Sequence, residues 1–322
     1  MTTKHKPKYK RLAQLKSSAE FIAYAHSVGA GLPFDDSPSG SAFGNIYSLR
    51  SGKTIGNRFS ILPMEGWDGN ADGSPSAFTR RRWMNFARSG AKLVWGCEAV
   101  AVTPEGRANP NQLLINERNL DSFKELRESI DEEHYKRFGN TNDLVVGLQL
   151  THSGRFCKPG SKTTLEPMIL YRHPILDKKL GLKEDCPLIT DDYVDRLIDE
   201  FAKAAKLAGR AGFHFVDIKH CHGYLGHEFL SARSRAGNYG GSFENRTRFL
   251  RSVVEAIRAA SPEMQVAVRL SAFDWVPFEQ SRNGEGFPCH SPGPYEFGFG
   301  TAPSGIAEDL TETFLFLELM RQ

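Results

Sequence analysis

The stretch DIKHCHGYLGHEFLS, residues 217–231, places many titratable side chains directly after the mainly apolar run FHFV. Lys219, His220, Cys221, His222 and Tyr224 all fall within it. These residue types bind metals, move protons or hold polarised oxygen atoms. Because such an apolar run is typical of a buried strand, we expect the group to lie at a strand end. A metal site, an acid–base site and an ordinary polar loop are the alternatives there.

His220 and His222 are the candidates for a metal site. They stand two residues apart and would share one face of a strand that continued through them. Zinc needs further ligands of suitable geometry, and the neighbouring Lys219 would repel a cation. A metal-dependent barrel hydrolase therefore stays open as an alternative function, although the sequence assigns no metal ligand.

Lys219, His222 and Tyr224 are the candidates for acid–base chemistry. Lysine or histidine can hold an anionic or polarised oxygen, and a tyrosine phenol, with a pKa of roughly 10, can deliver a proton at neutral pH. Gly223 can break the strand alternation and turn Tyr224 towards the rim of the fold. Donors fixed around a developing oxyanion each contribute about 2.7–4 kcal/mol in well-studied enzymes.

Two polar side chains interrupt other apolar runs. Gln149, in GLQLTHSGR, is either a satisfied core amide or a group that recognises a planar heterocycle through its donor and its acceptor. Arg269, in AVRLSA, carries a charge inside an apolar strand and needs an anionic or electron-rich partner. That partner is either a carboxylate of the protein, Glu98 or Glu65, or a ligand.

Composition limits the class of protein. The 322 residues are 40% hydrophobic and 25% charged, with a net charge of +3, which fits a globular protein and gives no case for nucleic acid. No apolar run is long enough to span a membrane, and the basic start MTTKHKPKYKRL is expected to be a solvated tail. The five cysteines show no CxxC spacing, which favours reduced thiols in a cytoplasmic protein.

From about residue 45 the pattern alternates between strands and helices. Strands are predicted near 58–65, 91–102, 143–154, 213–221 and 265–273, and helices near 76–90, 119–139, 190–212, 244–261 and 307–322. Nearly continuous apolar strands are typical of a parallel sheet covered by helices. Polar residues after several strands favour a (β/α)8 TIM-barrel type over a doubly wound sheet, because they converge at one end of a barrel. We divide the chain into 1–42, a basic tail with a peripheral helix, and 43–322, the barrel domain.

Five stretches together resemble the old yellow enzyme family of FMN-dependent ene-reductases. They are GNRFSILPM, EAVAVTPEGR, GLQLTHSGR, FVDIKHCHGYLGHEFLSA with NYGGSFENRTRF, and VAVRLSAF. The resemblance implies a TIM barrel that binds FMN at its C-terminal face. It also implies hydride transfer from NADH or NADPH through the flavin to an activated alkene, such as an α,β-unsaturated carbonyl compound.

The resemblance also implies site residues. Pro63, Met64 and Glu65 would line the flavin, although Glu65 replaces the small residue usual in the family. Ala99 would pack beside the isoalloxazine. Gln149 would bind the pyrimidine edge, and Arg269 would stabilise the reduced, anionic flavin. Tyr224 would protonate the substrate, and His222 with Lys219 would hold its polarised oxygen.

The sequence departs from the family in two ways. Lys219 stands where the family commonly has the first histidine of a carbonyl-binding pair, so an anionic or strongly polarised acceptor is expected. Three strands that would close the barrel and supply phosphate loops do not follow residue 322, so a C-terminal truncation after about five βα units is expected. A non-catalytic fragment or interaction module is therefore a further alternative. The expected partner is a small-molecule substrate, and a homo-oligomer is possible.

Overall fold

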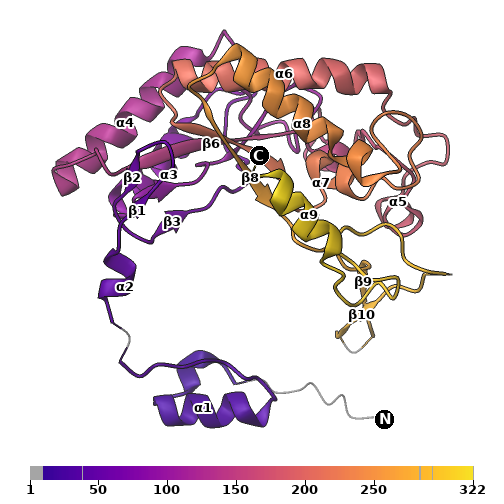
Figure 1. Ribbon diagram of the computed structural model, residues 1–322, viewed down its shortest axis with the longest axis horizontal. Coiled ribbons are helices and arrows are strands. Elements are labelled where there is room, and N and C mark those ends of the chain that lie inside the picture. The colour runs from indigo at the N-terminus through magenta and orange to yellow at the C-terminus, as the bar shows by residue number, and fades with distance from the viewer. Residues whose placement is uncertain (1–9, 38, 283, 292, 322) are drawn as a thin grey trace.

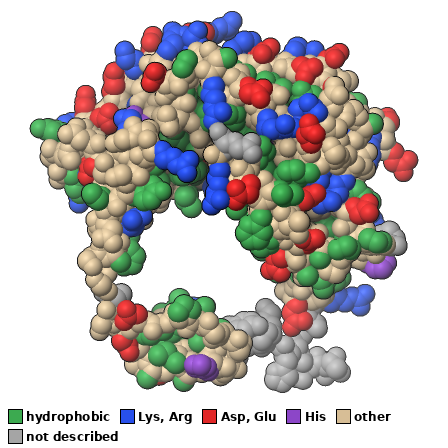
Figure 2. Space-filling model, viewed as in Figure 1, with side chains coloured by type: hydrophobic (Ala, Val, Ile, Leu, Met, Phe, Trp, Pro, Cys, Tyr) green, Lys and Arg blue, Asp and Glu red, His purple; other side chains and the backbone are tan. Residues whose placement is uncertain are grey.

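The computed structural model describes residues 10–37, 39–282, 284–291 and 293–321. Residues 1–9 of the basic tail lie outside the described ranges. The predicted peripheral helix is present as α1 (Ser18–Ser27), where the Ser17 side chain accepts a hydrogen bond from the Glu20 backbone N–H. This helix stands apart from the rest of the chain and is joined to it through the short helix α2 (Ser41–Gly44) (Figures 1 and 2).

The main body is built on one parallel sheet. Its strands are β3 Ser60–Ile61, β4 Leu93–Val94, β5 Ala99–Ala101, β6 Val145–Thr151, β7 Phe215–His220 and β8 Gln265–Leu270. Their order is β3–β4–β6–β7–β8, with β5 also paired to β6. Within the described residues β3 and β8 are the edge strands, so the sheet is open. The expected truncation stays a prediction.

Four long helices cover the outer face of the sheet (Figure 1). They are α3 Ala77–Arg88, α4 Leu120–Phe138, α6 Asp191–Arg210 and α8 Phe243–Ala260. Ser76, Thr190 and Ser242 cap three of them by accepting hydrogen bonds from first-turn N–H groups. A strand–helix–strand order is what the sequence predicts, and it brings the carboxyl ends of all strands to one edge. No helix in the described ranges is both long and apolar enough to cross a membrane.

Two apolar layers lie on opposite faces of the sheet. The large outer core lies between strands and helices and includes Val146, Leu148 and Leu150 of β6. The inner face has a smaller cluster, in which Val145 and Phe215 pack against Ile55. Ile55 belongs to the hairpin of β1 (Tyr47–Ser48) and β2 (Thr54–Ile55), which therefore covers the amino-terminal end of the sheet.

Gly147 creates the space that Phe215 fills. A Cβ atom at residue 147 would lie 2.2 Å from the Phe215 ring. We expect Gly147→Ala to lower the free energy of unfolding by about 1–3 kcal/mol, the usual cost of overpacking a core. Urea denaturation measures this. Gly31→Ala, where nothing lies within 4 Å, is the control and should be close to neutral; equal stability of both variants would contradict this packing.

The structure corrects some predicted boundaries. The strand predicted at 91–102 is two strands, because Gly96 and Cys97 interrupt it and Cys97 has a left-handed φ of 51°. The sequence also gave no sign of the short helices α5 (Pro174–Leu180) and α7 (Leu225–Leu230), or of the hairpin β9 (Phe278–Gln280) and β10 (Gly286–Pro288). Buried Arg155 forms ion pairs with Asp177 of α5 and Glu228 of α7, and so fixes the long segment after β6 to the main body.

Candidate active site

The polar side chains singled out in the sequence converge on the inner face near the carboxyl ends of the strands. The strand register pairs Ala99 with Gln149, Gln149 with Asp217, and Lys219 with Arg269. Residues two apart on a strand point to the same face, so Asp217 and Lys219 both point inward above Phe215. The site is therefore a polar layer above the apolar inner cluster.

Arg269 is not paired with either protein carboxylate considered for it. Its Nη1 donates to the Pro63 carbonyl oxygen over 3.1 Å, and the described residues place no carboxylate at ion-pair distance from it. Glu98 is instead buried against the Arg82 guanidinium and the Trp83 indole. The interpretation of Arg269 as a ligand-facing cation is thus the one that fits the geometry.

Gln149 is almost fully buried and is held from one side. Its Nε2 donates a 2.6 Å hydrogen bond to Oδ2 of Asp217. No residue in the described ranges is recorded as donating to its Oε1. The amide NH₂ group therefore has a protein partner, as a core amide would, but the amide oxygen has none among the described residues. That oxygen is available to accept a hydrogen bond from a ligand.

Lys219 and Tyr224 lie in direct contact. The Lys219 Nζ sits 3.5 Å from the centroid of the Tyr224 ring, an arrangement in which the ring face attracts the cation. Lys219 is 6% exposed, and burial lowers its pKa to about 8. At neutral pH it is therefore still mainly an ammonium ion, and within the described residues no carboxylate forms an ion pair with it.

Tyr224 reaches this position through a reversal of the backbone. His222 and Gly223 both have left-handed conformations, with φ of 62° and 70°. The Tyr224 ring lies 6.1 Å from that of Phe156, which belongs to the segment after β6. Gly223 thus breaks the strand alternation as predicted, and His222 contributes to the same turn of the backbone.

The two histidines considered for a metal separate. His220 is buried against the rings of Phe249 in α8 and Phe316 in α9 (Thr311–Leu319), on the outer face. His222 is exposed, and partial burial with the nearby charges of Lys219 and Arg269 lowers its pKa. The expectation that they share a face is wrong, because the strand ends at His220. Among the described residues no cluster of three or more potential metal ligands occurs.

The remaining residues of the candidate site differ in how far they are buried. Pro63 and Ala99 are buried, whereas Met64 is 49% exposed. Ala99 N–H donates to the Met64 carbonyl oxygen over 2.8 Å, which joins the ends of β3 and β5. Glu65 accepts a 2.9 Å hydrogen bond from the Trp67 indole. Cys221 is buried with its pKa raised by burial to about 11, which does not suit a nucleophile.

One polar member of the layer was not predicted. Asp217 is completely buried, and its carboxylate contacts both Gln149 and the Arg269 backbone. A signal existed in the sequence, because an aspartate inside FHFVDIKH must find donors or lose its charge.

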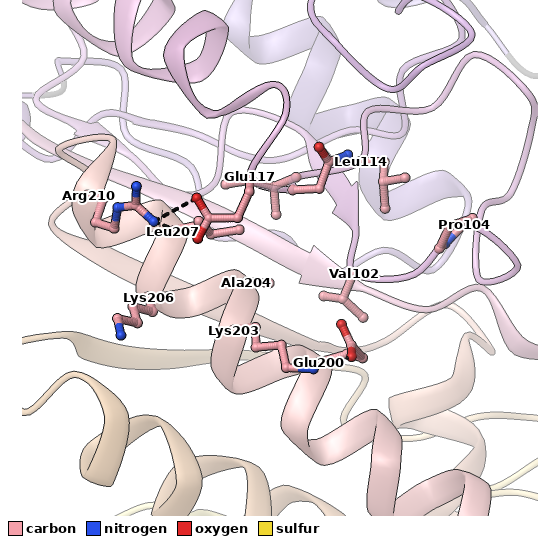
Figure 3. Close-up of a pocket in the computed structure, with 12 residues that line it drawn as sticks. Val102, Pro104, Leu114, Glu117, Glu200, Lys203, Ala204, Lys206, Leu207 and Arg210 are labelled. Carbon is pink, nitrogen blue, oxygen red and sulfur yellow. Dashed lines mark hydrogen bonds and ion pairs between the residues drawn. The ribbon is translucent and has the colours of Figure 1, made fainter.

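A separate surface hollow of about 440 Å³ lies between α6 and the segment after β5 (Figure 3). Its charged side chains largely neutralise one another. Arg210 donates to both oxygens of Glu117 over 2.7 and 2.8 Å, and Lys203 donates to Glu200 over 2.6 Å. We assign it no role.

Comparison with known proteins identifies the family. Residues 48–283 match the model of the NADH:flavin oxidoreductase / NADH oxidase family, and the chain belongs to that family. The NADPH dehydrogenase of Bacillus velezensis is 33% identical over 228 residues, which cover 69% of this chain and 62% of that protein. The NADPH dehydrogenase of Bacillus pumilus is 34% identical over 230 residues, with 70% and 62% coverage. The chain thus spans about three-fifths of the length of these relatives.

Solved structures support the fold. The old yellow enzyme from Pichia sp. superposes with a TM-score of 0.60 at 20% identity, covering 87% of this chain and 67% of that one. The old yellow enzyme homologue from Zymomonas mobilis gives 0.58 at 24% identity, with 72% and 63% coverage. The parallel α/β sheet is therefore of the TIM-barrel kind found in these proteins. The family uses FMN as cofactor, with NADH or NADPH as reductant.

The residues present fit the ring system of such a cofactor. A planar heterocycle that becomes anionic on reduction needs hydrogen-bonding partners in one plane and a nearby positive charge. Gln149 offers a free amide oxygen, and Arg269 offers a guanidinium with no carboxylate partner in the described part of the chain. Small Ala99 lies in register beside Gln149.

Proposed function

We propose that this chain belongs to an FMN-dependent oxidoreductase that passes hydride from NADH or NADPH to an activated alkene. The observation that carries the proposal is the meeting of three groups in one layer. They are the Gln149 oxygen, which accepts from no described residue, the Arg269 guanidinium, which has no carboxylate partner among the described residues, and the Lys219 ammonium against Tyr224. A structural polar cluster would pair these charges internally, whereas this one leaves them available to a ligand.

Each residue has a role that follows from its contacts. Gln149 and Arg269 hold the pyrimidine side of the FMN ring system, and Pro63, Met64, Glu65 and Ala99 border it. When bound, FMN supplies the hydride. Lys219 and His222 hold the polarised oxygen of the acceptor, and the Tyr224 phenol delivers a proton to its carbon.

Anaerobic half-reactions test the proposal. With FMN present, NADH or NADPH should bleach the visible flavin absorbance, and an α,β-unsaturated carbonyl compound should restore it. Absence of flavin binding, or a reduced flavin that no activated alkene reoxidises, would contradict the proposal.

Lys219 should favour acceptors with a negative or strongly polarised oxygen. A hydrogen bond to a charged group contributes about 1.5–3 kcal/mol, which is roughly 10- to 100-fold in binding. We therefore expect Lys219→Met to reduce kcat/KM for a carboxylate- or nitro-bearing alkene by about this factor. The loss for a simple neutral enone should be smaller.

Lys206→Met is the matched control for this variant. Lys206 borders the remote hollow on α6 and should leave both rates unchanged. If Lys219→Met lowered the two acceptors' kcat/KM values equally, Lys219 would have no part in acceptor selection.

A further inference from the structure

Asp217 makes two hydrogen bonds that between them use both carboxylate oxygens. Oδ2 accepts from Gln149 Nε2 and Oδ1 accepts from the Arg269 backbone N–H, each over 2.6 Å. The side chain is completely buried on β7, between the strands that carry its two donors. It is therefore placed to control how the Gln149 amide is oriented.

An ionised carboxylate only accepts hydrogen bonds. Burial raises the pKa of Asp217 to about 6, and the bond from Gln149 lowers it, so the group is mainly ionised at neutral pH. Gln149 must then turn its NH₂ towards Asp217 and its carbonyl oxygen away. The orientation of the amide follows from this chemistry.

We propose that Asp217 is a positioning residue that makes Gln149 present an acceptor, and only an acceptor, to the ligand. This rests on the proposed function. The site then selects a planar heterocycle that carries an N–H donor at this point, such as the imide N–H between the two carbonyl groups of a flavin. A ring with only acceptors along that edge would face the Gln149 oxygen unfavourably.

Asparagine at residue 217 should reverse the orientation. The Arg269 backbone N–H cannot turn, so the asparagine oxygen must stay on it and the asparagine NH₂ must face Gln149. Gln149 then rotates to accept that bond and presents its own NH₂ to the ligand. The hydrogen bond from the Arg269 backbone and the one between residues 149 and 217 are both kept, while the group offered to the ligand changes from acceptor to donor.

Exchanging the two side-chain types should restore the original orientation. In the double variant Asp217→Asn with Gln149→Glu, the asparagine donates to one oxygen of the glutamate. The other glutamate oxygen is presented to the ligand as an acceptor. Net charge and volume match those of the original pair.

FMN titration and urea denaturation together test the proposal. Asp217→Asn should bind FMN about tenfold or more weakly, the cost of facing a donor with a donor in a buried site. Its unfolding midpoint should stay close to that of the parent chain, and the double variant should recover most of the affinity. Unchanged FMN affinity in Asp217→Asn, or a loss that the double variant does not recover, would overturn the proposal.

A second measurement does not depend on the cofactor. In the ligand-free chain, the side-chain NH₂ resonances of Gln149 should shift as Asp217 titrates near pH 6 and should lose this dependence in Asp217→Asn. Resonances insensitive to both changes would overturn the positioning role. If the parent chain bound no FMN but showed this titration, the proposed function would fail while the positioning role stood.

Discussion

Replacing Tyr224 by phenylalanine is expected to slow reoxidation of reduced FMN by an activated alkene about 10²- to 10⁴-fold, the usual contribution of a positioned acid. Reduction of the flavin by NADH or NADPH should be nearly unchanged, because it needs no proton from the phenol. The ring remains in phenylalanine, so the contact with Lys219 and the neighbouring Phe156 is kept. Stopped-flow absorbance of the two half-reactions measures both rates.

Tyr135→Phe is the control for this experiment. Tyr135 lies on α4 and is 60% exposed, so both half-reactions should match those of the parent chain. Equal losses in the two half-reactions of Tyr224→Phe would mean that the hydroxyl acts in flavin binding and not in proton delivery.

Replacing Arg82 by leucine is expected to destabilise the fold by about 3–5 kcal/mol at neutral pH, because it leaves a buried carboxylate without its partner. Glu98 is completely buried, and burial raises its pKa even with the Arg82 guanidinium beside it. Arg82 also donates to Asp68 over 3.0 Å. Arg82 of α3 therefore links Asp68, in the segment after β3, to Glu98, the residue before β5.

The cost of Arg82→Leu should depend on pH in a defined direction. Without Arg82, the folded-state pKa of Glu98 rises further above its unfolded value. Between these two pKa values the folded state holds a proton on Glu98 that the unfolded state has lost. Stability of the variant should then fall as pH rises from the unfolded pKa towards the folded one, and the loss should be smaller at pH 5 than at pH 7. Urea denaturation at the two pH values measures the difference.

Arg80→Leu provides the matched control. Arg80 is on the same helix, and its ion pair with Glu125 is at the surface. Arg80→Leu should therefore lower the free energy of unfolding by less than about 1 kcal/mol. A cost of Arg82→Leu that equals that of Arg80→Leu would contradict the structural role of the buried pair.

The sequence was sufficient to predict the helices and strands whose apolar pattern follows from which face is buried. The helices α3, α4, α6 and α8 and the strands β6, β7 and β8 lie where apolar patterning predicted them. Their order along the chain implied a parallel sheet with its site at one edge, because each strand is followed by a helix that covers the same face. The hairpin β9–β10 and the helices α5 and α7 depend on tertiary contacts, such as those of Arg155, that no local pattern records.

The sequence predicted that the candidate residues would lie together, but it did not predict which of them contact each other. Gln149, Lys219, Tyr224 and Arg269 lie together as expected, since residues at the ends of adjacent parallel strands must converge. Which charge pairs with which was not predictable, because it depends on the register between strands. Glu98 was a candidate partner for Arg269, but the structure places it on Arg82.

Binding of FMN tests directly whether the layer of Gln149, Lys219 and Arg269 is a flavin site. Titrating the chain into FMN should quench flavin fluorescence to saturation, and Arg269→Met should weaken binding roughly 10- to 100-fold through loss of a charged hydrogen bond. Arg258→Met, an exposed position on α8, is the control and should bind like the parent chain. No quenching by the parent chain, or equal affinity of the Arg269 variant, would contradict the assignment of this layer as a flavin site.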